Sequence, residues 1–315
     1  MRFLQYILVG LLVAAASTLF PVTAHAAPLR IVTTTFAAWD WVRNIAPEAD
    51  LVLLQRGGAD LHGYEPTAAD LRVISSCDLF IHVGGESDTW VPAALALDAN
   101  PSRRVLPLVA ALGATAKPER LEEGMEAEEN EEDGDGPPPS DEHVWLSLRN
   151  AQILVSAIAD AIAAVDPGSA DTCRRNADSY NARLADLDAR CTAEFASAPR
   201  HTLLFADRFP FRYLADDYGL DCIAAFPGCS SESAASFRTI ATLARKTDEL
   251  GLTTIFTLEA PAGRLAETVR ASTRTRDQRI VALDSMQTLP NDWQNRSYID
   301  VMRDNFAKIL QSLTD

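Results

Sequence analysis

One long helical pattern divides this chain into two parts. Between residues 169 and 196, charged residues separate apolar side chains that recur at three- and four-residue spacing, namely Tyr180, Leu184, Leu187 and Cys191. This spacing places one apolar stripe along a helix. Pro199 ends the pattern, because proline cannot continue a helix. A helix of this length spans roughly 40 Å at 1.5 Å per residue, which is enough to join two folded units.

Short apolar or β-branched runs bounded by glycine or proline are typical of buried strands. Before the long helix they lie at 29–35, 51–54 and 79–83, and after it at 202–205, 222–224, 254–257 and 280–283. Helical patterns lie at 39–45, from Thr67 onward, and at 151–165, 237–250 and 298–313. Alternation of strands and helices indicates parallel sheets. We therefore predict an α/β fold of two Rossmann-like parallel-sheet lobes, 27–167 and 199–315, joined by one long rigid helix, 168–198.

Residues 1–26 have the features of a secretory signal peptide. Arg2 precedes an apolar run over 6–20 and a small-x-small sequence at 24–26, the order typical of an export signal. We expect cleavage after Ala26. No cysteine stands at that site, so a lipid anchor is not indicated. We predict a soluble periplasmic or extracytoplasmic protein, and an uncleaved N-terminal anchor is the alternative.

The net charge limits the partners that the chain can bind, and the cysteine count limits its disulfide bonds. The formal net charge of −16 repels nucleic acid and favours cations weakly and non-specifically. The five cysteines are an odd number for an exported chain, so at least one stays unpaired. Cys222 and Cys229 are close enough in sequence to bridge across a turn. No C-x-x-C pair is present, which gives no indication of a thiolate metal site.

An acidic segment interrupts the first lobe. Residues 122–140 are rich in glutamate and aspartate, contain three consecutive prolines and have no apolar periodicity. Such a composition predicts a disordered surface loop. The segment contains no histidine, so we interpret it as a solvated spacer rather than as a store of metal.

Four histidines follow the predicted signal peptide. His82 lies inside an apolar strand, where a hydrogen-bonded core histidine is the simplest interpretation, and His201 precedes a strand as a solvated turn residue. His62 and His143 instead lie at junctions on the rim of the first lobe. Ligands of α/β sheets bind at such rims, outside the carboxyl ends of the strands, and neutral imidazole is the commonest metal-binding side chain.

Two aspartates stand at matching places in the second lobe. Asp207 follows the strand at 202–205, and Asp284 follows the strand at 280–283. Each could equally be a helix cap or a turn residue. Together with His62 and His143 they would form a site of two nitrogen and two oxygen donors. A closed shell of four ligands suits storage or transport of an ion rather than catalysis.

Four motifs, in order along the whole chain, resemble those of the zinc- and manganese-binding solute-binding proteins of ABC importers, cluster A-I. They are His62-Gly63-Tyr64-Glu65-Pro66-Thr67-Ala68-Ala69-Asp70, His143-Val144-Trp145-Leu146, Asp284-Ser285-Met286 and Tyr298-x-x-x-Met302-x-x-Asn305. The resemblance implies two Rossmann-like lobes, a rigid linking helix, and one Zn²⁺ or Mn²⁺ ion per chain as transported cargo. We further expect a monomer that delivers the ion to an ABC permease, and the net negative charge argues against nucleic acid as a partner.

The resemblance carries His62, His143 and Asp284 over as metal ligands. Arg208 is nearest to the family's remaining ligand position, and a guanidinium cannot bind a cation. We therefore take the neighbouring Asp207 as the substitute. Two imidazoles and two carboxylates form a harder shell than three imidazoles do, which favours manganese or iron without excluding zinc. Metal binding should shift the population toward a closed or ordered cleft, through a small lobe tilt or the ordering of a loop.

Three other functions remain as alternatives. A metal-dependent hydrolase is one, although the chain contains no G-x-S-x-G and no H-E-x-x-H motif, and we do not expect an enzyme. A siderophore- or corrinoid-binding protein on the same scaffold is the second, because Arg208 and Arg212 could bind an anionic chelate. An adhesin-like interaction module is the third, and one chain could combine it with metal capture.

Overall fold

The computed structural model describes residues 28–315 apart from 57, 59, 99, 126–138, 231–234 and 260–262. The predicted signal peptide, 1–26, therefore lies outside the described residues, as does most of the predicted acidic loop. The ends of that loop are placed, and one of them is ordered against the second lobe. The backbone N–H of Ala224 donates to the carbonyl of Glu123 at 3.0 Å, and Lys246 pairs with the Glu123 carboxylate at 2.6 Å.

The first lobe is built on a parallel four-stranded sheet in the order β2-β1-β3-β4. Its strands are β1 (Arg30–Thr33), β2 (Asp50–Leu53), β3 (Leu79–His82) and β4 (Arg104–Pro107). Its helices are α1 (Phe36–Ile45), α2 (Ala68–Ser75), α3 (Val91–Ala96) and α4 (Leu108–Leu112). Four short 3₁₀ turns complete it, at η1 (Leu61–Gly63), η2 (Glu86–Asp88), η3 (Gly113–Thr115) and η4 (Val144–Leu146).

The second lobe repeats this topology with the order β6-β5-β7-β8, again parallel. Its strands are β5 (Thr202–Phe209), β6 (Asp221–Pro227), β7 (Thr254–Leu258) and β8 (Arg279–Leu283). Its helices are α7 (Arg212–Tyr218), α8 (Phe237–Leu250), α9 (Arg264–Ser272) and α10 (Tyr298–Thr314), with a 3₁₀ turn at η5 (Trp293–Asn295). In both sheets the strand order changes direction beside the first strand, and ligands of open α/β sheets bind at such a point.

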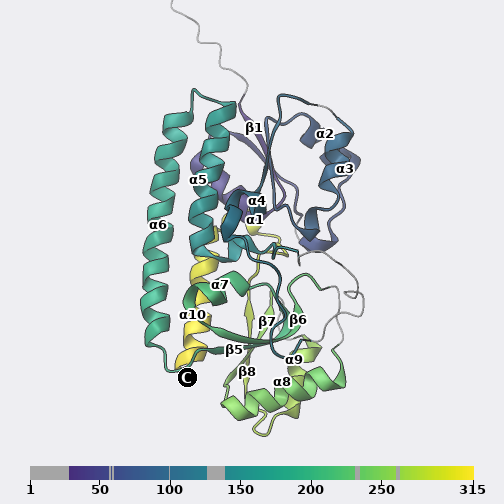
Figure 1. Ribbon diagram of the computed structural model, residues 1–315, viewed down its shortest axis with the longest axis vertical. Coiled ribbons are helices and arrows are strands. Elements are labelled where there is room, and N and C mark those ends of the chain that lie inside the picture. Colours follow the sequence, from purple (N-terminus) through teal and green to yellow (C-terminus); the bar gives the residue numbers. More distant parts are fainter. Residues whose placement is uncertain are drawn as a thin grey trace, which may run out of the picture.

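Two antiparallel helices follow, α5 (Leu148–Val165) and α6 (Ala170–Ser197). Figure 1 shows α5 beside the first lobe and the longer α6 running along one side of both lobes. The buried side chains of α6 follow the predicted three- and four-residue spacing: Cys173, Ala177, Tyr180, Leu184, Leu187, Cys191 and Phe195. Helix α5 is long and apolar enough to span a membrane by composition. It packs against α6, α4 and the first sheet, and most of its apolar residues are buried in the core of the protein.

The two lobes share one continuous hydrophobic core, which extends through α1, α5, α6, α7 and α10. A buried carboxylate strengthens this junction. Asp40 of α1 accepts hydrogen bonds from the Tyr180 hydroxyl of α6 at 2.9 Å and from the Tyr298 backbone of α10 at 3.1 Å. Nearby, the rings of Trp39 and Trp293 meet edge to face at 4.9 Å. Because one close-packed core continues across the junction, the lobes should resist a wide hinge motion.

The predicted fold class is confirmed, and the long helix stands where the pattern placed it. The chain forms elements that the sequence patterns did not indicate, namely β4, α3, α4 and α7. Strand β5 continues past the predicted end to Phe209, through a register shift between Phe205 and Arg208. The possible bridge between Cys222 and Cys229 does not form, because both thiols are free.

Candidate metal centre

His62 is held by an aspartate two residues before it. One carboxylate oxygen of Asp60 accepts hydrogen bonds from the backbone N–H of His62 at 2.9 Å and contacts the ring Nδ1 at 3.0 Å. The other oxygen of Asp60 pairs with Arg208 of the second lobe at 2.7 Å. With Nδ1 donating to Asp60, the lone pair of the neutral ring is on Nε2. A carboxylate behind a histidine in this way fixes the ring for metal binding.

His143 repeats the same arrangement. Asp141 accepts from the backbone N–H of His143 and contacts its Nδ1, both at 2.9 Å. The carbonyl of Asp141 accepts from the Tyr213 hydroxyl of α7 at 2.9 Å, which fastens this segment to the second lobe. The His143 side chain is fully buried. Its Nε2 atom has no hydrogen-bond partner among the described residues, which is costly for a buried polar atom unless a ligand completes it.

Glu142 lies between the two histidines. One of its oxygens, Oε2, accepts from the backbone N–H of Ser87 at 2.9 Å and from the Ser87 hydroxyl at 2.8 Å. The other oxygen, Oε1, lies 2.8 Å from Nε2 of His62. The backbone approaches this carboxylate closely at Gly85, where a Cβ atom would lie 2.3 Å from the glutamate side chain. Glycine is therefore required at that position.

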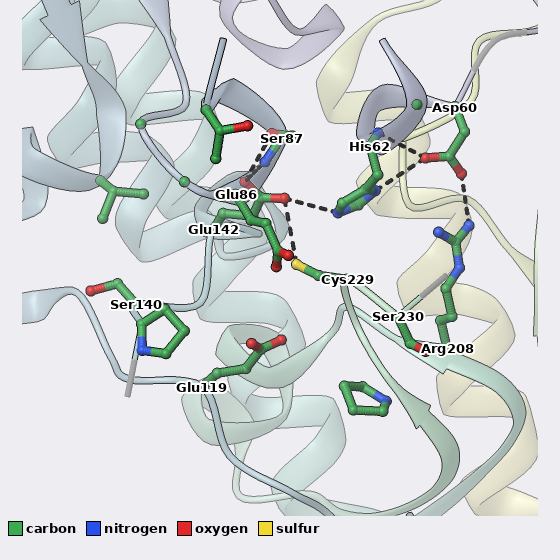
Figure 2. Close-up of a pocket in the computed structure, with 17 residues that line it drawn as sticks. Asp60, His62, Glu86, Ser87, Glu119, Ser140, Glu142, Arg208, Cys229 and Ser230 are labelled. Atoms are coloured by element: carbon green, nitrogen blue, oxygen red, sulfur yellow. Dashed lines mark hydrogen bonds and ion pairs between the residues drawn. The ribbon is translucent and has the colours of Figure 1, made fainter. Parts of the chain in front are cut away.

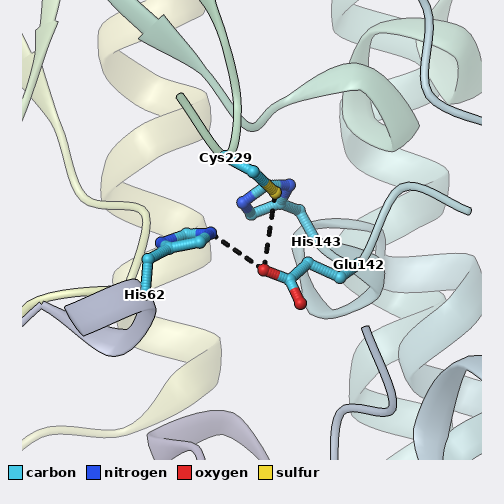
Figure 3. A group of neighbouring side chains, drawn as sticks. All are labelled: His62, Glu142, His143 and Cys229. Carbon is cyan, nitrogen blue, oxygen red and sulfur yellow. Dashed lines mark hydrogen bonds and ion pairs between the residues drawn. The ribbon is translucent and has the colours of Figure 1, made fainter. Parts of the chain in front are cut away.

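Cys229 completes a group of four side chains from both lobes. The thiol follows β6 and donates to Oε1 of Glu142 at 3.4 Å. One ligand atom from each of His62, Glu142, His143 and Cys229 lies within 4.8 Å of all the others. Figure 3 shows the imidazole of His62 pointing toward the other three side chains, with Cys229 beside the ring of His143. These residue types and this spacing can hold one transition-metal ion.

The group borders a cleft of about 1040 Å³ between the lobes. Figure 2 shows Glu119 and Glu142 extending into it from the first lobe, and Arg208 and Cys229 from the second. Burial raises the pKa of Glu119, and the neighbouring carboxylates of Asp141 and others raise it further. A cleft in which carboxylates outnumber basic groups attracts cations.

Burial and the neighbouring charges shift the pKa values of the side chains in this group. Burial alone would lower the pKa of His62, but the hydrogen bonds and charges of Asp60 and Glu142 outweigh it and raise that pKa to about 9. Burial alone would raise the pKa of Glu142, but His62 and His143 lower it to about 2. Burial and nearby carboxylates raise the pKa of the Cys229 thiol well above its usual value. Without a metal, a proton on His62 thus provides the positive charge beside Glu142.

Asp207 does not join this group. One of its carboxylate oxygens accepts from the backbone N–H of Arg208 at 2.9 Å, and the other accepts from the backbone N–H of Leu258 at 3.1 Å. Strands β5 and β7 pair directly only at Phe205 and Phe256. The aspartate side chain therefore joins these two strands where the backbone ladder is interrupted, and the residue lies inside β5 rather than after it.

Asp284 does not join the group either. One oxygen accepts from the backbone N–H of Met286 at 2.8 Å, and the other forms an ion pair with Arg296. Asn305 exchanges two hydrogen bonds with the Asp284 backbone, at 2.9 and 2.8 Å. The late motifs that end at Met286 and Asn305 thus meet in space and organise the turn after β8, beside a smaller cavity than the cleft.

The sequence predictions for the two remaining histidines are confirmed. His82 is buried and contacts Asp88 at 3.1 Å, and His201 is exposed. Thr67 and Asp70 form a capping box at the start of α2, where the sequence predicted a helix from Thr67 onward. Sequence reasoning missed Glu142 and Cys229. The sequence did contain a signal for the two histidines and the aspartates that hold them, because Asp60-x-His62 and Asp141-x-His143 repeat one pattern. No comparable pattern marks Cys229.

Fold and site together define a helix-linked, two-lobed protein with a candidate metal centre in its interlobe cleft. The chain belongs to the family described as the periplasmic component A of the zinc-uptake complex, whose model matches residues 31–312. It is 30% identical over 288 residues to the zinc-binding lipoprotein AdcA of Streptococcus pneumoniae, an alignment that covers 91% of this chain and 56% of AdcA. The chain thus spans about half the length of that relative.

Another relative is matched over most of its length. The high-affinity zinc uptake system protein ZnuA of Bacillus subtilis is 28% identical over 293 residues, which cover 90% of this chain and 88% of ZnuA. Among solved structures, the Zn(II)-bound ZnuA-like domain of Streptococcus pneumoniae AdcA has a TM-score of 0.72 and 26% identity, covering 91% of this chain and all of that domain. The periplasmic zinc-binding protein TroA of Treponema pallidum shares the fold, with a TM-score of 0.74 and 21% identity over 92% of this chain and all of TroA.

Proposed function

We propose that this chain captures one zinc ion in its interlobe cleft, outside the cytoplasmic membrane, and delivers it to an ABC permease. One observation carries the proposal: the imidazoles of His62 and His143 are both fixed through Nδ1 by an aspartate, and each places a ligand atom in one compact group with Glu142 and Cys229. The zinc-binding names of its relatives support zinc over manganese as the cargo.

The geometry explains how capture would work. Rings held by Asp60 and Asp141 need little further ordering, so binding costs less conformational entropy than it would at mobile side chains. An incoming divalent ion would replace the proton of His62 and take over the contact with Glu142. Because the group includes residues of both lobes, the ion would stabilise the arrangement in which the lobes are close together.

A binding role fits this group better than catalysis does. A catalytic zinc keeps one position open for water or substrate, whereas a closed shell of protein ligands holds the ion. The group offers four protein donors. We therefore propose a transport component without enzymatic activity, which acts as a monomer and passes its ion to the membrane partner.

The chelate-binding alternative needs arginines that are free to bind an anionic ligand. Arg208 lines the cleft, but its guanidinium is paired with Asp60 at 2.7 Å. Arg212 is buried at the start of α7 and does not line the cleft. Neither arginine favours a siderophore or corrinoid over a bare ion.

The test is elemental analysis of the purified protein, followed by competition titration against a chromogenic chelator with zinc, manganese and iron in turn. We expect one zinc ion per chain, lost in His62→Ala and kept in the control His201→Ala, which replaces an exposed histidine. Wild-type protein that binds none of the three metals tightly would refute the proposal.

Delivery is tested separately in living cells. A bacterium that lacks its own zinc-binding component should grow under zinc limitation when it receives this chain with its cognate permease, and should not grow with His62→Ala. Rescue by the His62→Ala variant would show that the chain supports growth by a route that does not use this site.

A further inference from the structure

We propose that Cys229 supplies a thiolate ligand from the second lobe, so that sulfur completes the metal site and the site selects zinc-like cations over manganese. This inference rests on the proposed function and goes beyond it by naming a ligand that the sequence motifs did not indicate. It replaces Asp207 and Asp284 as the donors of the second lobe.

The thiol of Cys229 lies within reach of the other three side chains. Sγ of Cys229 lies 3.4 Å from Oε1 of Glu142 and within 4.8 Å of a ligand atom of each histidine. An independent observation points to a missing ligand at the same place: Nε2 of His143 is fully buried and has no hydrogen-bond partner among the described residues. A cation at the centre of the group would satisfy that atom.

The backbone just before Cys229 packs closely against His143. Gly228 packs directly on the ring of His143, where a Cβ atom would lie 2.6 Å from Cε1 and 3.1 Å from the carbonyl oxygen of Phe209. Only glycine allows the turn after β6 to approach the imidazole this closely. The thiol is therefore held against the buried histidine by the chain itself, as Figure 3 shows.

The other candidate ligands of the second lobe, Asp207 and Asp284, are engaged in hydrogen bonds and an ion pair elsewhere. Both carboxylate oxygens of Asp207 accept backbone hydrogen bonds, and Asp284 is engaged by Met286 and Arg296. Among the described residues, Cys229 is the member of the four-residue group that the second lobe contributes. The ion would join the lobes through the bond to sulfur.

The donor set determines the expected selectivity. Two imidazole nitrogens, one carboxylate oxygen and one thiolate sulfur suit zinc, which accepts nitrogen and sulfur ligands in tetrahedral sites. Manganese prefers carboxylate, carbonyl and water oxygens. As the metal–sulfur bond forms, the thiol proton passes to solvent and the thiolate supplies the electron pair, so the metal keeps its oxidation state.

Zinc X-ray absorption spectroscopy on the loaded full chain tests the assignment without requiring a variant. We expect one sulfur scatterer at about 2.3 Å from zinc, in addition to nitrogen and oxygen scatterers at about 2.0–2.2 Å. Zinc bound at one ion per chain with nitrogen and oxygen scatterers alone would overturn the thiolate and leave the proposed function in place. A chain that binds no zinc would refute the proposed function itself.

Two cysteine variants then locate the sulfur. Cys229→Ser should lose the sulfur scatterer, while Cys222→Ser should keep it, because Cys222 is buried within β6 and lines a different cavity. We expect Cys229→Ser to lower the ratio of zinc to manganese affinity by at least the roughly 10-fold that the loss of a supporting group costs, because serine replaces the sulfur donor with an oxygen. An unchanged sulfur scatterer in Cys229→Ser would contradict the assignment.

Discussion

The two lobes have the same strand order, but their polar residues near the strand ends differ in what holds them. In the first lobe, Asp60 and Asp141 bind Nδ1 of the histidine two residues later and leave the Nε2 atoms unengaged by these aspartates. In the second lobe, Asp207 and Asp284 accept bonds from nearby backbone N–H groups and from Arg296. A position at the end of a strand thus brings a side chain near a ligand site, but its hydrogen bonds decide whether a donor atom remains free.

The largest effect should come from the buried histidine of the first lobe. His143→Ala removes an imidazole that is already oriented, and we expect zinc affinity to fall by more than the roughly 100-fold that the loss of a supporting residue costs. Competition titration measures the change, and circular dichroism checks that the variant folds. Near wild-type affinity in a folded His143→Ala protein would contradict the comparison between the lobes.

The aspartates behind the histidines should give the next largest effect. Asp141→Asn removes the charge that fixes His143 but keeps the shape of the side chain. We expect zinc affinity to fall by roughly 10- to 100-fold, as is usual when an outer-shell carboxylate is lost. The same titration measures it. If this change had no effect, the repeated D-x-H pattern would be only a turn motif.

The aspartate of the second lobe should affect stability more than binding. Asp284→Asn weakens the ion pair with Arg296, and we expect unfolding to become easier by about 1–3 kcal/mol, the range for charged hydrogen bonds in partly buried positions. Zinc affinity should change less than in the histidine variant. Chemical denaturation and titration of the same preparation compare the two effects. A loss of affinity as large as that of His143→Ala would restore Asp284 as a ligand.

The smallest effect on binding should come from the cap of α2, which lies within the motif that begins at His62. Thr67→Ala removes the hydroxyl that accepts from the Asp70 backbone, and we expect a loss of about 1 kcal/mol in stability with unchanged zinc affinity. Thermal unfolding with and without zinc measures both. A large drop in affinity would show that this motif positions His62 through α2.

The fold could be predicted well because its signals are local. The stripe on α6 and the buried runs of β1, β3 and β7 show the expected periodicities. Strand β4 was missed because Arg104 and Pro107 leave it only two consecutive apolar residues of the kind typical of strands, Val105 and Leu106. The extension of β5 was missed because Asp207 and Arg208 interrupt its apolar pattern, and the register shift that accommodates them depends on the neighbouring strands.

Two of the four residues of the candidate site could be predicted from the sequence. His62 and His143 are rare residues at rim positions, and the structure brings them together with ring centroids 5.6 Å apart. The donors Glu142 and Cys229 could not be found from spacing. Glu142 lies in an acidic run where one carboxylate cannot be distinguished from another, and Cys229 reaches the site only because Gly228 permits close contact with His143.

The most direct test is a crystal structure of the zinc-loaded protein with diffraction recorded on both sides of the zinc absorption edge. The account predicts one anomalous peak per chain, bonded to Nε2 of His62 and Nε2 of His143, with Cys229 on the side of the second lobe. A peak beside Asp207 or Asp284 and away from both histidines would contradict it.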